Sequence, residues 1–323
     1  MKVITNPHYK LPKNPKSHTL GWTMHWAFKL GAEINHDCDQ SVQSYSKVYI
    51  DHGVNFGGNL NLFGGANDEV YRKFSNLLEC KNIVSLDHDM PDFGEMLKGR
   101  IKAKTTSKLI TPEWCDQVTE MCKRTKTLRQ ENLIHNDSSI SLGDSHTPAF
   151  SQLNDVVLRR NGRTLAGSLK KGLTKYIEEY RIRDTNHVNF VLGSIDIRHH
   201  VMRDSNPVSY ISELLYEYTH QLKEVRQIVK SISIASPVPV EFEARKLPKT
   251  GYFEGTPFYG TREQRLEITK IFFEIMEPNF EIVHPPCEWY EMDGEEFANK
   301  CMEFGGSVHL SPLCYRRNNW GKL

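Results

Sequence analysis

Short apolar runs alternate with longer segments of helical periodicity in the first part of the chain. Residues 47–50 and 82–86 are rich in Val, Ile and Tyr or Leu, and each run predicts a buried strand. Residues 67–78 carry apolar positions at helical spacing, and Asn67 stands where a helix cap is expected. A second helix is predicted to begin at Thr111-Pro112, because proline at the first helical position loses no hydrogen bond. This alternation favours βα units and a mainly parallel sheet.

The same alternation begins again near residue 137. Apolar runs at 139–142, 188–192 and 231–235 predict three more strands. Between residues 208 and 232, apolar side chains recur at helical spacing with charges between them, which predicts a long amphipathic helix. Further on, Thr261 and Gln264 have the spacing of a capping box that opens another helix.

The polar stretch 129–138 separates the two strand-led series and is the predicted domain boundary. We therefore expect an α/β protein with two domains. The C-terminal one, over 137–323, is expected to be a doubly wound, mainly parallel sheet. A smaller Rossmann-like α/β domain over 1–130 is expected to precede it, as an accessory or ligand-binding domain. No internal repeat is visible in the sequence.

Charge and hydropathy restrict the classes of protein that fit. Lys plus Arg number 41 against 40 Asp plus Glu, so a net charge of +1 does not indicate a nucleic-acid partner. No segment approaches the roughly 20 apolar residues that span a bilayer, and residues 1–7 lack the apolar run of a secretory signal. The seven cysteines are scattered without a Cys-x-x-Cys pair, which argues against structural zinc and a disulfide framework. We expect a cytoplasmic protein without a membrane partner and with free thiols.

The segment Gly143-Asp144-Ser145-His146 has the most informative pattern for chemistry. It follows a predicted strand and precedes a predicted helix, so it places a serine hydroxyl at the carboxyl end of a parallel sheet, where open α/β folds bind ligands. Gly-Asp-Ser is also a common structural turn.

Two later segments add acid, base and guanidinium groups. The predicted strand at 188–192 leads into Gly193–His200, which carries Asp196, Arg198 and His200 at a second strand end. These groups can line a pocket, or they can form a salt-bridged strand end. His309 follows in a late loop, so the chain order is serine, polar cluster, histidine.

On these residues the sequence resembles the SGNH (GDSL-like) hydrolase superfamily over about residues 137–315. The resemblance implies that Ser145 is the nucleophile and His309 its general base. It further implies that the N–H groups of Ser145 and Gly167 form the oxyanion hole, and that no cofactor takes part. The implied activity is a serine esterase or deacylase for an ester, possibly O-acetyl, of a sugar- or nucleoside-like substrate. The remaining groups expected in the substrate pocket are Asp144, His146, Asp196, Arg198 and His200.

The sequence departs from this family at two positions. Gly306 stands where the last block of the family has aspartate, and Ile195 stands where the third block has asparagine. Without that aspartate, His309 needs a backbone carbonyl or another carboxylate to hold its tautomer. His146, His199 and His200 are alternative bases.

Two other functions fit the same pattern. The first is an acyltransferase that uses the same nucleophile. The second is a catalytically inert protein that binds a sugar nucleotide or phosphate, including a glycosyltransferase-like arrangement of two α/β domains.

A second candidate site lies in the first 130 residues. A glycine-rich stretch ahead of the helix at 67–78 can cradle a phosphate through backbone N–H groups. It lacks a Walker-type lysine and Gly-x-Gly-x-x-Gly spacing, so a flexible surface loop is the simpler interpretation. The glycines concerned are Gly57, Gly58, Gly64 and Gly65. No metal site is expected, and the only alternative is a divalent site from two strand-end pairs, namely Asp51, His52, Asp87 and His88. Trp22, Trp26 and Phe28 are expected to pack in the core.

Overall fold

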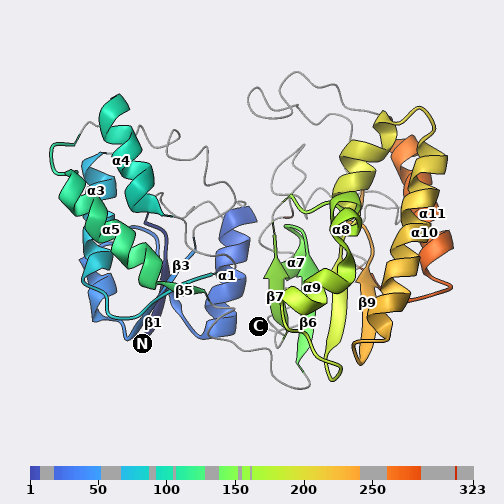
Figure 1. Ribbon diagram of the computed structural model, residues 1–323, viewed down its shortest axis with the longest axis horizontal. Coiled ribbons are helices and arrows are strands. Elements are labelled where there is room, and N and C mark those ends of the chain that lie inside the picture. Colours follow the sequence, from blue (N-terminus) through green and yellow to red (C-terminus); the bar gives the residue numbers. More distant parts are fainter. Residues whose placement is uncertain are drawn as a thin grey trace. The chain divides into compact units, whose positions relative to one another are not determined.

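The computed structural model describes most of the chain. The described residues are 1–7, 18–51, 67–86, 92–104, 107–127, 138–151, 155–160, 162–240, 260–284 and 310, with only the backbone described at 18–22 and 100–104. The chain divides into two compact units, Met1–Leu133 and Ile134–Leu323 (Figure 1).

The first unit contains a five-stranded sheet in which all the pairs are parallel. Its strand order is β2-β1-β3-β4-β5. The strands are β1 (Lys2–Thr5), β2 (Glu33–Asn35), β3 (Lys47–Ile50), β4 (Ile83–Ser85) and β5 (Lys126–Thr127), and the α-helices are α1 (His18–Leu30), α3 (Asp68–Leu78), α4 (Phe93–Lys104) and α5 (Pro112–Arg124). Helices α3, α4 and α5 cover one face of this sheet and α1 covers the other (Figure 1).

The second unit contains another five-stranded parallel sheet, with the order β10-β9-β8-β6-β7. The strands are β6 (Ser139–Gly143), β7 (Val156–Arg159), β8 (His187–Val191), β9 (Ser231–Ala235) and β10 (Glu281–Val283). The α-helices are α7 (Thr147–Phe150), α8 (Leu165–Lys171), α9 (Leu173–Glu179), α10 (Pro207–Arg226) and α11 (Arg262–Met276).

The two faces of the second sheet differ in polarity. Leu142, Phe190 and Ile234 belong to the apolar core that packs against α8, α9, α10 and α11. The opposite face carries Ser141 and Asn189, which are buried. The Asn189 side-chain amide donates to the carbonyl of Phe150 at 3.4 Å, and this contact places α7 on the polar face. Because helices lie on both faces, the second sheet is doubly wound.

Both sheets have the same topology, although the sequence shows no repeat. If the strands of each unit are numbered along the chain, both orders read 2-1-3-4-5. In this arrangement the connections diverge between the first and third strands, and ligands bind outside the carboxyl ends of those strands. The two positions of interest are therefore the ends of β1 and β3 in one unit, and the ends of β6 and β8 in the other.

The helix starts predicted from capping residues are confirmed. Asn67 accepts a hydrogen bond from the N–H of Val70, and Thr111 accepts one from Trp114. Thr261 and Gln264 form the complete capping box of α11. These interactions are local, so the sequence alone is sufficient to predict them.

Two predictions about helices are wrong: one concerns where a helix ends, and the other concerns which side chains a helix buries. The helix predicted over 208–232 ends at Arg226, because the chain turns at 227–230 and then forms β9. Phe28 is 41 % exposed, whereas Trp26 is buried as expected. Phe28 is two residues after Trp26, about 200° around a helix, so the two side chains cannot share one face.

Two further properties agree with the sequence expectations for the part of the chain that is described. None of its helices is both long and apolar enough to cross a bilayer. The cysteines at 38, 80, 115 and 122 are buried free thiols. Burial raises the pKa of each of these four thiols to about 11, so none is a thiolate at neutral pH.

Candidate functional site

The chain turns at the carboxyl end of β6, where Gly143 allows β6 to lie close to the end of β8. The N–H of Asp144 donates to the carbonyl of Val191 at 3.0 Å, which joins the turn to the end of β8. A Cβ atom at position 143 would lie 2.7 Å from the Val191 carbonyl carbon and closer still to its oxygen. Glycine is therefore required here, because a side chain would push β6 away from β8.

Ser145 follows this turn and keeps its hydrogen-bond donors uncommitted. The residue is only 5 % exposed. Its neighbours are engaged: the N–H of His146 donates to Asp144 Oδ1, and the N–H and hydroxyl of Thr147 donate to the Asp144 carbonyl. Within the described ranges, neither the N–H nor the hydroxyl of Ser145 makes a hydrogen bond. Since buried N–H groups are nearly always paired, Ser145 has donors available for a ligand.

Asp144 and His146 form a buried pair on either side of Ser145. Asp144 Oδ1 lies 2.8 Å from the His146 backbone nitrogen and 3.2 Å from His146 Nδ1. The other oxygen of this carboxylate, Oδ2, is buried without a hydrogen-bond partner in the described structure. A buried carboxylate oxygen without a partner is costly, so it is a feature to expect at a binding site rather than in a packing core.

A rare turn follows β8 at the neighbouring position. Gly193 has a φ of +103°, which glycine adopts without strain, and residues Asp196–His200 then form a single π-helical turn. Such turns occur frequently at functional sites. This turn places Asp196 at the start of α8, where its two carboxylate oxygens accept the N–H groups of Leu165 (2.6 Å) and Ala166 (3.1 Å).

Asp196 is fully buried, and this has an electrostatic consequence. Burial raises the pKa of its carboxyl to about 6. The two backbone donors act in the opposite direction, and the negative charge of Asp144 adds to the increase. Asp144 and Asp196 therefore lie close enough for their charges to interact, and they join the ends of β6 and β8 into one polar region.

The expected second oxyanion donor, Gly167, is already engaged. Its N–H donates to Thr164 Oγ1 at 3.0 Å, as part of the N-terminal cap of α8. The preceding two N–H groups of the helix are taken by Asp196. The expectation for Gly167 is corrected accordingly: in this structure its N–H is not available to an oxyanion.

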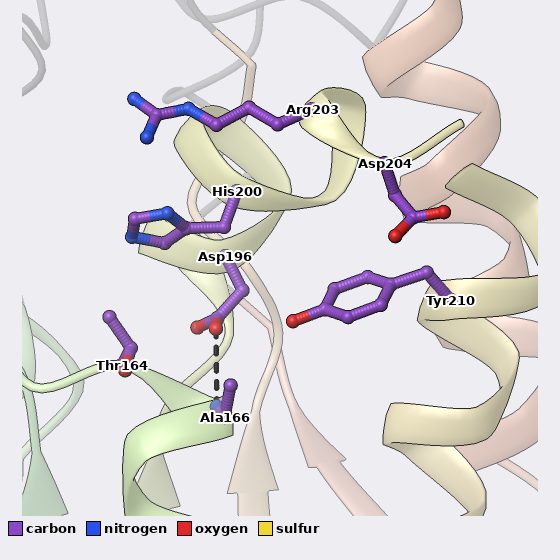
Figure 2. Close-up of a pocket in the computed structure, with 7 residues that line it drawn as sticks. All are labelled: Thr164, Ala166, Asp196, His200, Arg203, Asp204 and Tyr210. Atoms are coloured by element: carbon purple, nitrogen blue, oxygen red, sulfur yellow. Dashed lines mark hydrogen bonds between the residues drawn. The ribbon is translucent and has the colours of Figure 1, made fainter. Parts of the chain in front are cut away.

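A pocket of about 410 Å³ opens beside Asp196 (Figure 2). Seven residues line it, from the start of α8, the π-helical turn, the turn after it and the first turn of α10: Thr164, Ala166, Asp196, His200, Arg203, Asp204 and Tyr210. The tyrosine hydroxyl points toward the Asp196 carboxylate (Figure 2).

The predicted pocket residues divide into two groups. Asp196 and His200 line this pocket. Arg198 does not line it, because this side chain is buried and its Nε donates to the carbonyl of Ser194 at 3.0 Å. Asp144 and His146 are likewise absent from the lining and belong to the buried turn around Ser145.

Sequence reasoning missed Thr164 and Ala166 at the start of α8, and it also missed three lining residues further along the chain, Arg203, Asp204 and Tyr210. The available signal was their position around the start of α10, which Asn206-Pro207 marks by the same rules that identified the other helix starts. A helix that begins directly after a strand-end cluster brings its first turn to the same edge of the sheet.

Several predicted site residues lie outside the described residues. They are His309, Gly306, His52, Asp87, His88, Gly57, Gly58, Gly64 and Gly65. Asp51 is described, and its carboxylate accepts the hydroxyl of Thr23 while its carbonyl accepts the amide of Asn6. Among the described residues there is no cluster of three or more His, Cys, Asp or Glu side chains suited to a metal.

Comparison with known proteins finds no matching family model, no matching curated protein and no matching solved structure. Function must therefore be inferred from the groups that gather at the ends of β6 and β8.

The raised pKa of Asp196 predicts a pH-dependent stability. Its folded pKa of about 6 exceeds the ordinary 3.8, so the contribution of this group is fully present below about pH 3.8 and is lost as pH rises through 6. Asp196→Asn removes this titration. The free energy of unfolding of the wild type, relative to the variant, should fall by up to about 1.4 kcal/mol per pH unit within that window.

Urea unfolding of both proteins at pH 4, 5, 6 and 7 measures this difference. Titrations of other groups cancel in the comparison, and the difference should become constant above the window. A difference that is the same at all four pH values would show that Asp196 ionises normally.

Proposed function

We propose that the second unit acts as an SGNH-type serine esterase or deacylase with Ser145 as its nucleophile. One observation carries this proposal: Ser145 presents an uncommitted hydroxyl and an uncommitted N–H at the carboxyl end of β6, next to the end of β8. A serine esterase needs a hydroxyl that attacks the carbonyl and N–H groups that stabilise the oxyanion, and Ser145 offers one of each.

The reaction follows from these residue types. The hydroxyl oxygen of Ser145 attacks the ester carbonyl while its proton passes to a base, and His309 is assigned this role on its place in the sequence. The Ser145 N–H stabilises the tetrahedral oxyanion, a contribution of about 2.7–4 kcal/mol for one donor. Collapse of this intermediate releases the alcohol with the proton from the base. Water then attacks the acyl-enzyme and releases the acid.

The adjacent pocket supports a polar substrate. Its lining contains two carboxylates, an imidazole, a guanidinium and two hydroxyl groups, and Ala166 is its one apolar residue. Such a lining offers several hydrogen-bond partners to a polyhydroxylated substrate. Asp196 lines the pocket, and its charge interacts with that of Asp144, the residue before Ser145. These features favour an ester of a sugar- or nucleoside-like substrate.

Hydrolysis of 4-nitrophenyl acetate by the full chain tests the activity. The proposal predicts turnover that saturates with substrate and increases with enzyme concentration. Repeating the assay with an added polyol as acceptor distinguishes hydrolysis from transfer, because an acyltransferase would form an acetylated polyol at the expense of free acetate. The absence of turnover under both conditions would contradict the proposal.

A second candidate function is favoured by a different observation. Both units have the strand order 2-1-3-4-5, so each has its own ligand-binding edge. A protein that binds a sugar nucleotide with two α/β units, as glycosyltransferase-like proteins do, would have this plan. Saturable binding of UDP-glucose, together with no ester turnover, would favour this function over the first.

A further inference from the structure

Asp144 is held firmly in the turn after β6, and one of its carboxylate oxygens is left over. Its N–H donates to the Val191 carbonyl at 3.0 Å, and its own carbonyl accepts the N–H and the hydroxyl of Thr147. Oδ1 accepts the N–H of His146 at 2.8 Å. Oδ2 has no hydrogen-bond partner among the residues that the structure describes, although the residue is only 1 % exposed. The carboxylate cannot rotate to find one without breaking the bond at Oδ1, so a partner for Oδ2 has to come from outside the turn.

Asp144 Oδ2 belongs to the same small turn as the uncommitted donors of Ser145. The hydrogen bond from the His146 N–H to Oδ1 closes an Asx-turn, of which Ser145 is the middle residue. This turn holds the carboxylate against the backbone of Ser145. The N–H and the hydroxyl of Ser145 make no hydrogen bond to any described part of the chain. Two buried, consecutive residues therefore offer one acceptor and two donors to a ligand.

The ester group of the proposed substrate uses only the two donors. Its carbonyl oxygen accepts the N–H of Ser145, and its carbonyl carbon is attacked by the hydroxyl. An acetyl ester carries no hydrogen-bond donor of its own, so it would leave Asp144 Oδ2 unpaired, which is costly for a buried carboxylate. The missing donor therefore belongs to the alcohol part of the substrate. In a polyol, the donor nearest to the ester is a hydroxyl on the carbon next to the acylated one.

We propose that the substrate is a partially acylated polyol, and that Asp144 selects esters with a free hydroxyl on the carbon adjacent to the acylated carbon. This hydroxyl donates to Asp144 Oδ2 while the Ser145 N–H holds the carbonyl oxygen. The inference rests on the proposed esterase function and names the substrate class of the same site. A polyol acylated at every adjacent position has only acceptors there and is a poor substrate.

Three small acetate esters test this selection in the wild-type protein at neutral pH. 2-Hydroxyethyl acetate has a donor on the adjacent carbon, 2-methoxyethyl acetate has only an acceptor there, and propyl acetate has neither. We expect kcat/KM for the hydroxyethyl ester to exceed that for each of the others at least about tenfold, because a site built around a hydroxyl rejects analogues that lack it. Titration of the released acetic acid at constant pH measures all three rates.

Asp144→Asn replaces the acceptor by a donor with little change in shape. Asparagine forms the same Asx-turn, so its amide oxygen should keep the N–H of His146 and its NH₂ group should take the place of Oδ2. The hydroxyl and methoxy oxygens can both accept from this NH₂ group. The preference for the hydroxyethyl over the methoxyethyl ester should therefore disappear in the variant. An undiminished preference would show that the methoxy group is excluded by its size, and it would overturn the inference.

Asp155→Asn is the matched control for this variant. Asp155 is also buried, but its Oδ2 already accepts the hydroxyl of Ser141 at 2.9 Å. The same change there should leave the preference of the wild type intact, and thermal melting verifies that both variants fold. Loss of the preference in both variants would contradict a specific role of Asp144. If Asp144→Asn does not fold, the wild-type comparison decides, because equal kcat/KM for the three esters overturns the inference without any variant.

These results are separable from a failure of the proposed function. Turnover of 4-nitrophenyl acetate, which has no adjacent hydroxyl, reports the esterase activity by itself. That turnover combined with equal kcat/KM for the three alkyl esters rejects selection by Asp144 and keeps the esterase. No turnover of any of these esters rejects the esterase and this inference with it.

Discussion

Replacing Ser145 with alanine is expected to abolish ester cleavage by this protein. The substitution removes the one hydroxyl that is placed to attack the substrate, while the fold is retained because Ser145 makes no hydrogen bond within the described structure. Loss of a catalytic serine costs several powers of ten in kcat, so we expect a decrease of at least about 10³-fold. Steady-state hydrolysis of 4-nitrophenyl acetate by the purified wild type and variant measures it.

Ser151→Ala is the matched control for this experiment. Ser151 lies six residues further along the chain, is also buried, and its hydroxyl donates to the Thr147 carbonyl at 2.6 Å. The same chemical change there should lower stability by about 1 kcal/mol and leave most of the ester cleavage. Full activity in Ser145→Ala, or an equal loss in both variants, would contradict the role of Ser145.

Gly143→Ala is expected to cause the largest loss of stability. The new Cβ would approach the backbone of Val191 to 2.7 Å or less, and real Cβ atoms do not come so close to other heavy atoms. Relieving this steric clash requires β6 and β8 to separate, which breaks the hydrogen bond between the Asp144 N–H and the Val191 carbonyl. We expect the free energy of unfolding to fall by about 3 kcal/mol or more, as measured by urea denaturation.

Gly99→Ala makes the same glycine-to-alanine change at a position where we expect the opposite effect on stability. Gly99 lies inside α4, and a Cβ there meets no atom within 4 Å. Alanine should therefore stabilise the helix by about 1 kcal/mol. If Gly143→Ala were tolerated as well as Gly99→Ala, the close approach of β6 and β8 would not exist in solution.

The parts of the fold that depend on local interactions could be predicted from the sequence. Asn67, Thr111 and Thr261 cap their helices as predicted, because a cap is a hydrogen bond between residues two or three positions apart. The strands at 47–50 and 231–235 were predicted at their observed limits, because each is a short apolar run with turns on both sides. The shortest strands, such as β2 and β10, have three residues and too little pattern to be recognised.

The candidate site was less predictable, because its contacts join distant parts of the chain. Gly167 was expected to offer a free N–H, but Thr164 accepts it, and Asp196 occupies the start of the same helix from 30 residues away. Arg198 was expected in the pocket, yet the π-helical turn directs it to the Ser194 carbonyl. The pattern of residue types could not show the π-helical turn, which sets the direction of the Arg198 side chain.

The most direct test of the central claim is covalent labelling of Ser145. A fluorophosphonate probe reacts with a serine whose hydroxyl is activated as a nucleophile, and peptide mass spectrometry then identifies the modified residue. The account predicts one adduct, on Ser145, which forms in the native protein and is absent after unfolding in urea. An intact native protein that forms no adduct, or an adduct on another serine with Ser145 unmodified, would contradict it.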